Sequence, residues 1–170
     1  DMLRTHALWL RLIVATAINA LKRSLPGPVR VNLLLDEICN LGYMEPLDTA
    51  MGMIAKKGVK VWTVWQSLSQ ISRVYGEHGR ETFLSGVGML NSFKADDLET
   101  AEYLSKRLGR RTEIVTSHNN GTISASKTDS AAGYPLMHPD QIMTMGPREM
   151  LCWIDRLPHP VKLKAPVYTD

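Results

Sequence analysis

A mostly apolar segment, Val29 to Leu35, ends directly at two adjacent acidic residues, Asp36 and Glu37. A run of Val and Leu without clean polar alternation is typical of a strand that is buried on both faces, as central strands of parallel sheets are. In open parallel sheets, ligands gather at the carboxyl ends of the strands. The acidic pair is therefore expected at the functional edge of a sheet, and this run constrains the fold more than any other segment.

Helical and extended periodicities alternate along most of the 170 residues, as they do where crossover helices join the strands of a parallel sheet. Beside the first run, extended segments are expected at residues 59–65, 87–93, 111–116, 150–157 and 161–168. Helices are expected at residues 3–23, 46–57, 67–75, 80–84, 97–108 and 139–145. The pattern predicts an α/β fold with at least four strands and with helices on both faces of the sheet.

Several helix ends carry recognisable signals. Gly58 and Gly76 each follow a helical segment, and Asp96 with Glu99 has the spacing of a capping box. From residue 117 to 133 the chain is polar, small and glycine-containing. Such a segment buries too little apolar surface to offset its ordering entropy, so a mobile loop is expected over 117–133.

Composition narrows the protein class only broadly. A content of 44% hydrophobic and 22% charged residues is ordinary for one globular domain, and a net charge of +3 does not by itself identify a nucleic-acid-binding protein. Cys39 and Cys152 match no metal or disulfide spacing, which suggests reduced thiols. The most apolar run, Ala7 to Leu21, contains Arg11 and is too short to span a bilayer, so it predicts a buried helix.

An apolar strand that ends in Asp-Glu is typical of the Walker B element of nucleotide-hydrolysing enzymes. In that element the aspartate holds the Mg²⁺ of the nucleotide, and the glutamate orients and polarises the attacking water. Gln66 follows the next expected strand, so it would stand at the same edge, where it could contact a γ-phosphate or the lytic water. Taken singly, a charged strand end that meets solvent and a solvent-facing glutamine explain these residues equally well.

Other candidate features favour structural roles. The five histidines have no metal-ligand spacing, and the turn Ser85 to Gly88 precedes a strand, so it lacks the helix that a phosphate-binding turn requires. The basic run Lys106 to Arg111 could touch a phosphate backbone, but a solvated helix end is the favoured interpretation. The four tryptophans lie among apolar neighbours and are expected in the core: Trp9, Trp62, Trp65 and Trp153.

Three stretches resemble consecutive blocks of the TraG-like type IV coupling proteins, the ring ATPases that feed DNA and protein into conjugation and type IV secretion channels. They are VNLLLDEICNLGYMEPLDTA, KGVKVWTVWQSLSQISRVYG and DDLETAEYLSKRLGRRT. The last 33 residues, HPDQIMTMGPREMLCWIDRLPHPVKLKAPVYTD, resemble the closing helix-strand-strand of the family. The resemblance covers the chain from about Val29 to its end, and more weakly the leading helix within residues 1–25.

The resemblance implies a RecA-like P-loop NTPase core with ATP and Mg²⁺ as cofactors. It implies that Asp36 is the metal-associated acid, Glu37 the water-activating base and Gln66 the polar sensor, with all three close to the nucleotide. Gln70, Tyr75 and Gly76 match family positions as structural or coupling groups. The family often carries a trans-acting arginine where this chain has Ala55, followed by two lysines. The candidates for that cation are Lys56, Lys57, Arg73, Arg80, Arg110 and Arg111.

The phosphate-gripping sequence G-x-x-x-x-G-K-[ST] is absent from the chain. In the family this Walker A loop lies upstream, so residues 1–170 resemble only the C-terminal portion of the motor domain. Alone, the chain is expected to hydrolyse ATP negligibly. Two alternatives remain open: a non-catalytic assembly or docking module with the same fold, and a DNA-pumping ATPase of the FtsK or HerA type.

The resemblance also implies the setting in which the full-length protein works. Expected partners are single-stranded DNA, relaxase or effector substrate proteins and components of the type IV secretion channel, with a homo-hexameric assembly. The full-length protein is expected at the cytoplasmic face of the bacterial inner membrane, anchored upstream. The chain itself is expected to be soluble and to make no membrane contact.

Overall fold

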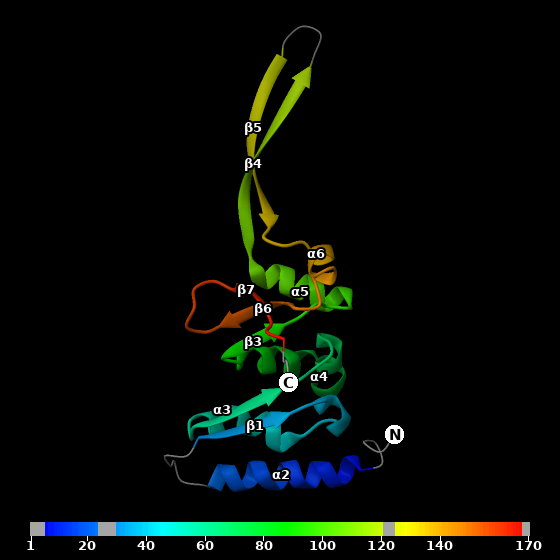
Figure 1. The fold of residues 1–170 in the computed structure, drawn as a ribbon, viewed down its shortest axis with the longest axis vertical. Helices are drawn as coiled ribbons and strands as arrows, with labels where there is room; N and C mark the ends of the chain where they lie inside the picture. The colour runs from blue at the N-terminus through cyan, green and yellow to red at the C-terminus, as the bar shows by residue number, and fades with distance from the viewer. Residues whose placement is uncertain (1–5, 24–29, 121–124, 168–170) are drawn as a thin grey trace. The chain divides into compact units, whose positions relative to one another are not determined.

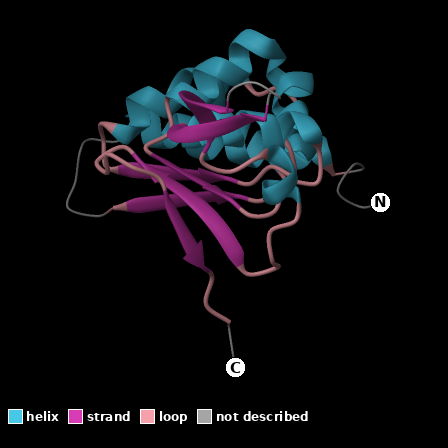
Figure 2. Cartoon of the chain, turned by 90° about the horizontal axis from the view of Figure 1, so that it is seen from above, coloured by secondary structure: helices cyan, strands magenta, loops and turns pink. Residues whose placement is uncertain are grey.

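The computed structural model describes residues 6–23, 30–120 and 125–167, and it divides the chain into two compact units, Asp1–Gly88 and Met89–Asp170. We call them unit 1 and unit 2. Helices and strands alternate along both (Figures 1 and 2). This element order confirms the α/β class that the periodicity predicts.

The described part of unit 1 contains one parallel strand pair and four helical segments. Its elements are α2 (Ala7–Arg23), β1 (Val31–Leu35), the short 3-10 helix η1 (Ile38–Leu41), α3 (Glu45–Ala55), β2 (Val59–Thr63) and α4 (Leu68–Ser85). Strands β1 and β2 run parallel, with Val31 opposite Val59 and Leu35 opposite Thr63. The predicted strands at 29–35 and 59–65 are therefore confirmed as neighbours.

One face of the β1–β2 pair carries the core of unit 1. Val31, Leu33 and Leu35 alternate along β1, so they share this face, and they pack with Ile18 of α2 and Ile54 of α3. Ile18 and Ile54 are completely buried. The two helices therefore cover the same face of the pair.

Among the described residues of unit 1, the other face of the strand pair is exposed, so the expected burial of the first strand on both faces is not found there. Leu34 is 67% exposed, and Trp62 and Val64 are also exposed. An apolar run shows that a strand favours burial, but whether both faces are covered depends on which elements lie over them. In unit 1 the helices α2 and α3 use one face only.

Helix α2 is also less buried than its composition predicts. Among its residues only Ile18 is fully buried, whereas Leu8 is 82% and Trp9 is 68% exposed. The expectation that Trp9 and Trp62 lie in the core is therefore wrong. Arg11, which interrupts the apolar run, donates hydrogen bonds to the carbonyl oxygens of Leu41 (3.0 Å) and Tyr43 (2.9 Å). The arginine ties α2 to the chain that leaves η1.

Helix α4 joins the two helical segments predicted at 67–75 and 80–84 across a kink at Gly76. This glycine has φ 72° and ψ 173°, which is not helical backbone. Residues other than glycine hardly ever adopt a backbone conformation with such a positive φ and an extended ψ. The glycine therefore acts as the predicted helix interruption, although the second helical segment follows at once.

Unit 2 is built on an antiparallel sheet with the strand order β3-β6-β7. Its elements are β3 (Met89–Ser92), α5 (Leu98–Leu108), β4 (Arg110–Asn120), β5 (Ala125–Pro135), α6 (Pro139–Met143), β6 (Glu149–Ile154) and β7 (Val161–Lys164). The predicted edge position of the last strand is confirmed. The parallel pairing that the alternating pattern suggests for most of the chain does not extend to unit 2, because β3 pairs antiparallel with β6. Periodicity indicates that a segment is a strand but not which neighbour it meets.

The segment predicted as a mobile loop, 117–133, largely forms an antiparallel hairpin. Strand β4 pairs with β5 along their whole lengths, from Arg110 opposite Pro135 to Asn120 opposite Ala125 (Figure 1). Residues 121–124 lie outside the described part. The loop prediction is therefore wrong over 117–120 and 125–133. Backbone hydrogen bonds hold such a ladder, and they do not require the apolar side chains whose absence suggested a loop.

The cap of α5 lies one residue later than the spacing suggests. Asp97, not Asp96, is the N-cap, and its side chain accepts a hydrogen bond from the backbone N–H of Thr100 at 2.9 Å. Ala101 and Leu104 are buried in the core of unit 2. Either of two consecutive aspartates could cap the helix. The burial of Ala101 and Leu104 fixes where the helix lies and so makes Asp97 the cap.

Candidate functional site

The carboxyl ends of β1 and β2 lie side by side in unit 1. Leu35 is opposite Thr63, and the backbone N–H of Val64 donates to the carbonyl oxygen of Leu35 at 3.1 Å. Asp36 follows Leu35 directly, and Gln66 follows Thr63 by three residues. Since both strands run the same way, the acidic pair and the glutamine leave the same edge of the sheet. The parallel pairing of β1 with β2, which is needed to bring the three residues to one edge, is therefore present.

Glu37 has left-handed backbone, with φ 47° and ψ 41°. It has the only positive φ outside glycine in the part of the chain that the structure describes. A left-handed residue with a side chain costs about 1–2 kcal/mol. The turn is imposed from both sides, because Leu35 before it and Ile38 after it are both buried. The fold thus holds the exposed acidic pair in a strained turn between two anchored residues, and strain of this kind concentrates at functional sites.

Each carboxylate of the pair uses one oxygen locally. The Asp36 Oδ1 accepts from the backbone N–H of Glu37 at 3.0 Å, and the Glu37 Oε2 accepts from the Asn40 side chain at 3.0 Å. The second oxygen of each carboxylate has no partner in the described part of the chain. Both side chains are exposed. The pair is therefore held in place while keeping two oxygens available for a ligand.

Gln66 is bound to Gln70, one turn into α4. The backbone N–H of Gln66 donates to Gln70 Oε1 at 3.1 Å, and Gln70 Nε2 donates to Gln66 Oε1 at 2.9 Å. Between them, Ser67 is the N-cap of α4, and its hydroxyl accepts from the backbone N–H of Gln70 at 3.3 Å. Sequence reasoning missed this pair, although the spacing Ser67-x-x-Gln70 is that of a capping box.

The structure brings Asp36, Glu37 and Gln66 to one edge, but no hydrogen bond or ion pair among the described residues joins the carboxylates to the glutamine. Trp65, which precedes the glutamine in the chain, meets Tyr75 and Phe83 edge to face, with ring centroids 6.2 and 5.8 Å apart. The candidate site therefore consists of the acidic pair and the glutamine, each exposed to solvent.

The donor set fits a magnesium ion that is shared with a phosphate ligand. No cluster of three or more His, Cys, Asp or Glu side chains occurs among the described residues, so the chain provides no complete all-protein metal cage there. Mg²⁺ commonly binds one or two carboxylates and takes its other ligands from waters and substrate phosphates. The free oxygens of Asp36 and Glu37 suit that mode.

Most of the cations considered for the trans-acting role are engaged elsewhere. Lys57 donates to the carbonyl oxygen of Lys22. The other contacts are Arg80 with Glu77 (2.7 Å), Arg110 with the carbonyl of Gly133 (2.7 Å) and Arg111 with Glu113 (2.6 Å). Lys56 and Arg73 are exposed and have no partner within the described ranges. The structure assigns the role to none of them.

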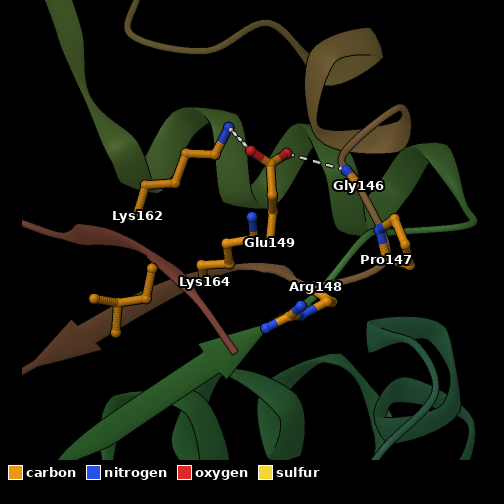
Figure 3. Close-up of a pocket in the computed structure, with 7 residues that line it drawn as sticks. Gly146, Pro147, Arg148, Glu149, Lys162 and Lys164 are labelled. Carbon is orange, nitrogen blue, oxygen red and sulfur yellow. Dashed lines mark hydrogen bonds and ion pairs between the residues drawn. The ribbon is translucent and has the colours of Figure 1, made fainter. Parts of the chain in front are cut away.

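Unit 2 has a hollow of about 670 Å³ of its own (Figure 3), lined by Gly146, Pro147, Arg148, Glu149, Lys162, Leu163 and Lys164. Its single carboxylate is already engaged: Glu149 accepts from the Lys162 ammonium at 2.8 Å and from the backbone N–H of Gly146 at 3.0 Å. These two contacts, that of Lys162 first, hold the pKa of Glu149 below its ordinary value. The hollow contains none of the predicted site residues and leaves no carboxylate oxygen free for a metal ion.

Comparison with solved structures defines the class of protein. The plasmid coupling protein TrwB, solved in complex with ADP and Mg²⁺, matches 97% of this chain with a TM-score of 0.75 at 19% sequence identity, and the match covers 38% of the TrwB chain. At this identity the likeness shows the fold. The chain shares the α/β fold of TrwB, which confirms the predicted RecA-like fold class.

The family model described as type IV secretory system conjugative DNA transfer matches residues 1–170. The chain is 33% identical over 168 residues to the protein VirD4 of Rhizobium rhizogenes, and 30% identical over 158 residues to a probable conjugal transfer protein TraG of Sinorhizobium fredii. These matches cover 95% and 88% of this chain but only 25% and 24% of the relatives. The chain belongs to this family of type IV coupling proteins, as the resemblance predicts, and spans about a quarter of the length of these relatives.

Helix length and apolar character together decide whether a segment can cross a bilayer. Within the described ranges, no helix combines the two to the extent that a membrane span needs.

Proposed function

We propose that this chain is the C-terminal portion of the motor domain of a coupling ATPase, which uses ATP hydrolysis to drive single-stranded DNA and attached protein into a type IV secretion channel. The observation that carries the proposal is the meeting of Asp36, Glu37 and Gln66 at the carboxyl edge of the parallel pair β1–β2. Ligands of open parallel sheets bind at this edge. Membership in the conjugative DNA transfer family supports the same conclusion.

Each of the three side chains has a distinct role in this proposal. Asp36 holds the Mg²⁺ of the nucleotide through its free carboxylate oxygen, and Glu37 orients and polarises the attacking water as a general base. Gln66 makes a neutral hydrogen bond to the γ-phosphate or to the water. When bound, Mg²⁺ and ATP would supply the phosphoryl group and neutralise its developing charge.

The chain holds only part of what such catalysis needs. Gripping the phosphates requires a glycine-rich loop with a lysine, and the sequence contains no such loop. Positioning and electrostatic stabilisation supply most of the rate enhancement in phosphoryl transfer. We therefore infer that the complete site also uses residues outside this chain.

The wider setting belongs to the same proposal. We infer a homo-hexamer at the cytoplasmic face of the inner membrane, which receives relaxase or effector proteins and meets the secretion channel. Support comes from the relatives, since the chain resembles a protein named for conjugal transfer and the plasmid coupling protein TrwB. The trans-acting cation would come from an exposed residue such as Arg73 or Lys56.

Glu37→Gln in the complete gene product tests the proposal. The amide keeps the size of the side chain but cannot accept a proton, so hydrolysis should fall by about 100-fold or more while bound ATP is retained. Conjugative transfer should then cease. Glu81→Gln on α4, another exposed glutamate of unit 1, is the matched control and should change neither hydrolysis nor transfer.

A second candidate, a non-catalytic docking module with the same fold, is favoured by Ala55 at the position where the family often has an arginine. This candidate predicts that Glu37→Gln leaves transfer unchanged. Transfer that persists at the wild-type level in this variant would therefore refute the motor function proposed for Glu37 and support the docking module.

A further inference from the structure

The contacts between Gln66 and Gln70 determine which end of each side-chain amide is oxygen. The backbone N–H of Gln66 is always a donor, and it points at one end of the Gln70 amide at 3.1 Å. That end must be the oxygen. The other end, Gln70 Nε2, is therefore a donor, and the Gln66 atom that it meets at 2.9 Å must be Oε1.

The Gln70 amide thus bridges two atoms of the same residue, the backbone nitrogen and the side-chain oxygen of Gln66. This bridge restricts the rotation of the Gln66 side chain relative to its own backbone. Gln70 can reach back in this way because side chains in a helix tilt toward its N-terminus. The Ser67 cap places Gln70 in the first turn of α4 and so fixes the point from which it reaches.

The bridge occupies one acceptor position of the Gln66 side-chain amide and leaves both of its donors without a partner among the described residues. Its Oε1 is engaged by Gln70, whereas its Nε2 has no partner in the described part of the chain. Gln66 is exposed, so the two N–H groups of Nε2 are available to a ligand. A hydrogen-bond donor without charge suits an anionic acceptor such as a phosphate oxygen.

We propose that Gln70 is a positioning residue that orients the Gln66 amide with its N–H groups toward the phosphate end of the nucleotide. This inference rests on the proposed function, which places a nucleotide at this edge. It adds a direction to the contact: Gln66 donates a hydrogen bond to a phosphate oxygen through Nε2, and its Oε1 is held by Gln70. Gln70 acts only through Gln66 and touches no reacting atom.

Gln70→Glu separates this role from simple helix capping. A glutamate at this position still accepts from the backbone N–H of Gln66, and negative charge in the first turn of a helix is favourable. A capping role therefore predicts unchanged or higher stability and normal activity. A carboxylate cannot donate, however, so the Gln66 amide would turn its Nε2 toward the introduced carboxylate and present Oε1 to the ligand.

Gln141→Glu in α6 is the matched control. Gln141 occupies the same third position of its helix and accepts from the backbone N–H of the N-cap residue His138 at 2.8 Å. It lies in unit 2, on a helix that carries none of the predicted site residues. The same chemical change there should alter neither the kinetics nor the Gln66 signals.

The first measurement needs no nucleotide. In the 170-residue chain, the side-chain amide signals of Gln66 are assigned by their loss in Gln66→Ala, and the temperature dependence of their proton shifts is recorded by NMR. In the wild type these protons should behave as solvent-exposed. In Gln70→Glu one of them should become hydrogen-bonded. Unchanged Gln66 protons in Gln70→Glu would overturn the proposed orientation.

The second measurement is steady-state hydrolysis by the complete gene product. With Gln70→Glu, kcat should fall about tenfold or more, since misplacing a contacting group by a small distance costs up to about 100-fold. KM for ATP should change little, because a contact made mainly in the transition state affects kcat. A normal kcat in Gln70→Glu, while Glu37→Gln abolishes hydrolysis, would overturn the positioning role alone. Hydrolysis that is insensitive to Glu37→Gln would instead overturn the proposed function.

Discussion

Replacing Gly76 by alanine should destabilise unit 1 through the backbone alone. Gly76 has φ 72° and ψ 173°, a combination that is accessible essentially only to glycine. A Cβ atom built on this residue would meet nothing within 4 Å. A clash with more distant parts of the chain is therefore not expected, and the cost should arise from the local backbone conformation.

The expected loss can be worked out from two opposing effects. Forcing a side chain into such backbone costs about 1–3 kcal/mol. The alanine also restricts the unfolded chain, which returns about 0.4–1 kcal/mol. The net expectation is a loss of roughly 1 kcal/mol, within limits of about 0 and 2.6 kcal/mol. Gly86, the C-cap of the same helix, is the control: its φ of −87° suits any residue and its nearest atom, the Thr82 carbonyl oxygen, is 3.5 Å from the added Cβ.

Urea unfolding followed by tryptophan fluorescence measures this loss. Trp153 is the one tryptophan in the sequence of unit 2, so a Trp153→Phe background makes the emission report unit 1. Trp65 then lies against the Tyr75 ring beside the kink. Gly76→Ala should lower the free energy of unfolding, and Gly86→Ala should leave it equal or slightly higher. Equal values for the two variants would refute the backbone argument.

Three further predictions concern the cap of α5, the pH response and the isolated chain. Asp97→Ala should cost about 1 kcal/mol of stability in denaturant unfolding, because it removes the bond to the Thr100 amide, whereas Asp96→Ala should be nearly neutral. Because the contact with Lys162 lowers the folded-state pKa of Glu149, this residue stabilises the fold at pH above its ordinary carboxyl value of about 4.5. That contribution should be lost as the pH falls through the lowered pKa, and Glu149→Gln should flatten this part of the stability curve; a curve of unchanged slope would contradict the assignment. The 170-residue chain alone should show no ATPase activity above background in a phosphate-release assay, and turnover comparable to that of the complete gene product would contradict the need for residues outside the chain.

The placement of the three candidate residues at one edge of a parallel strand pair was predictable from the sequence. Asp36, Glu37 and Gln66 follow two apolar runs, and parallel pairing of these runs brings all three to one edge. Such reasoning works because the composition of a strand and the chemistry of the residues that follow it are local properties. The family resemblance was readable for the same reason, since its blocks are continuous stretches of chain.

The geometry within the site was not predictable. Nothing in the residue type of Glu37 indicates left-handed backbone, which arises because Leu35 and Ile38 are both anchored in the core. The direction of the Gln66 amide depends on where the cap of α4 places Gln70. Both features follow from packing that a pattern of residue types does not contain.

The sequence by itself determined the α/β order of elements, the family and the acidic pair at the end of β1. Periodicity, glycine signals and residue chemistry act over short stretches, so they can be read without coordinates. Only the tertiary structure decided the antiparallel pairing of β3 with β6, the hairpin β4–β5 and the open second face of β1 and β2 in unit 1. These depend on which segments meet, and segments far apart in sequence meet through packing and backbone hydrogen bonds that no single stretch specifies.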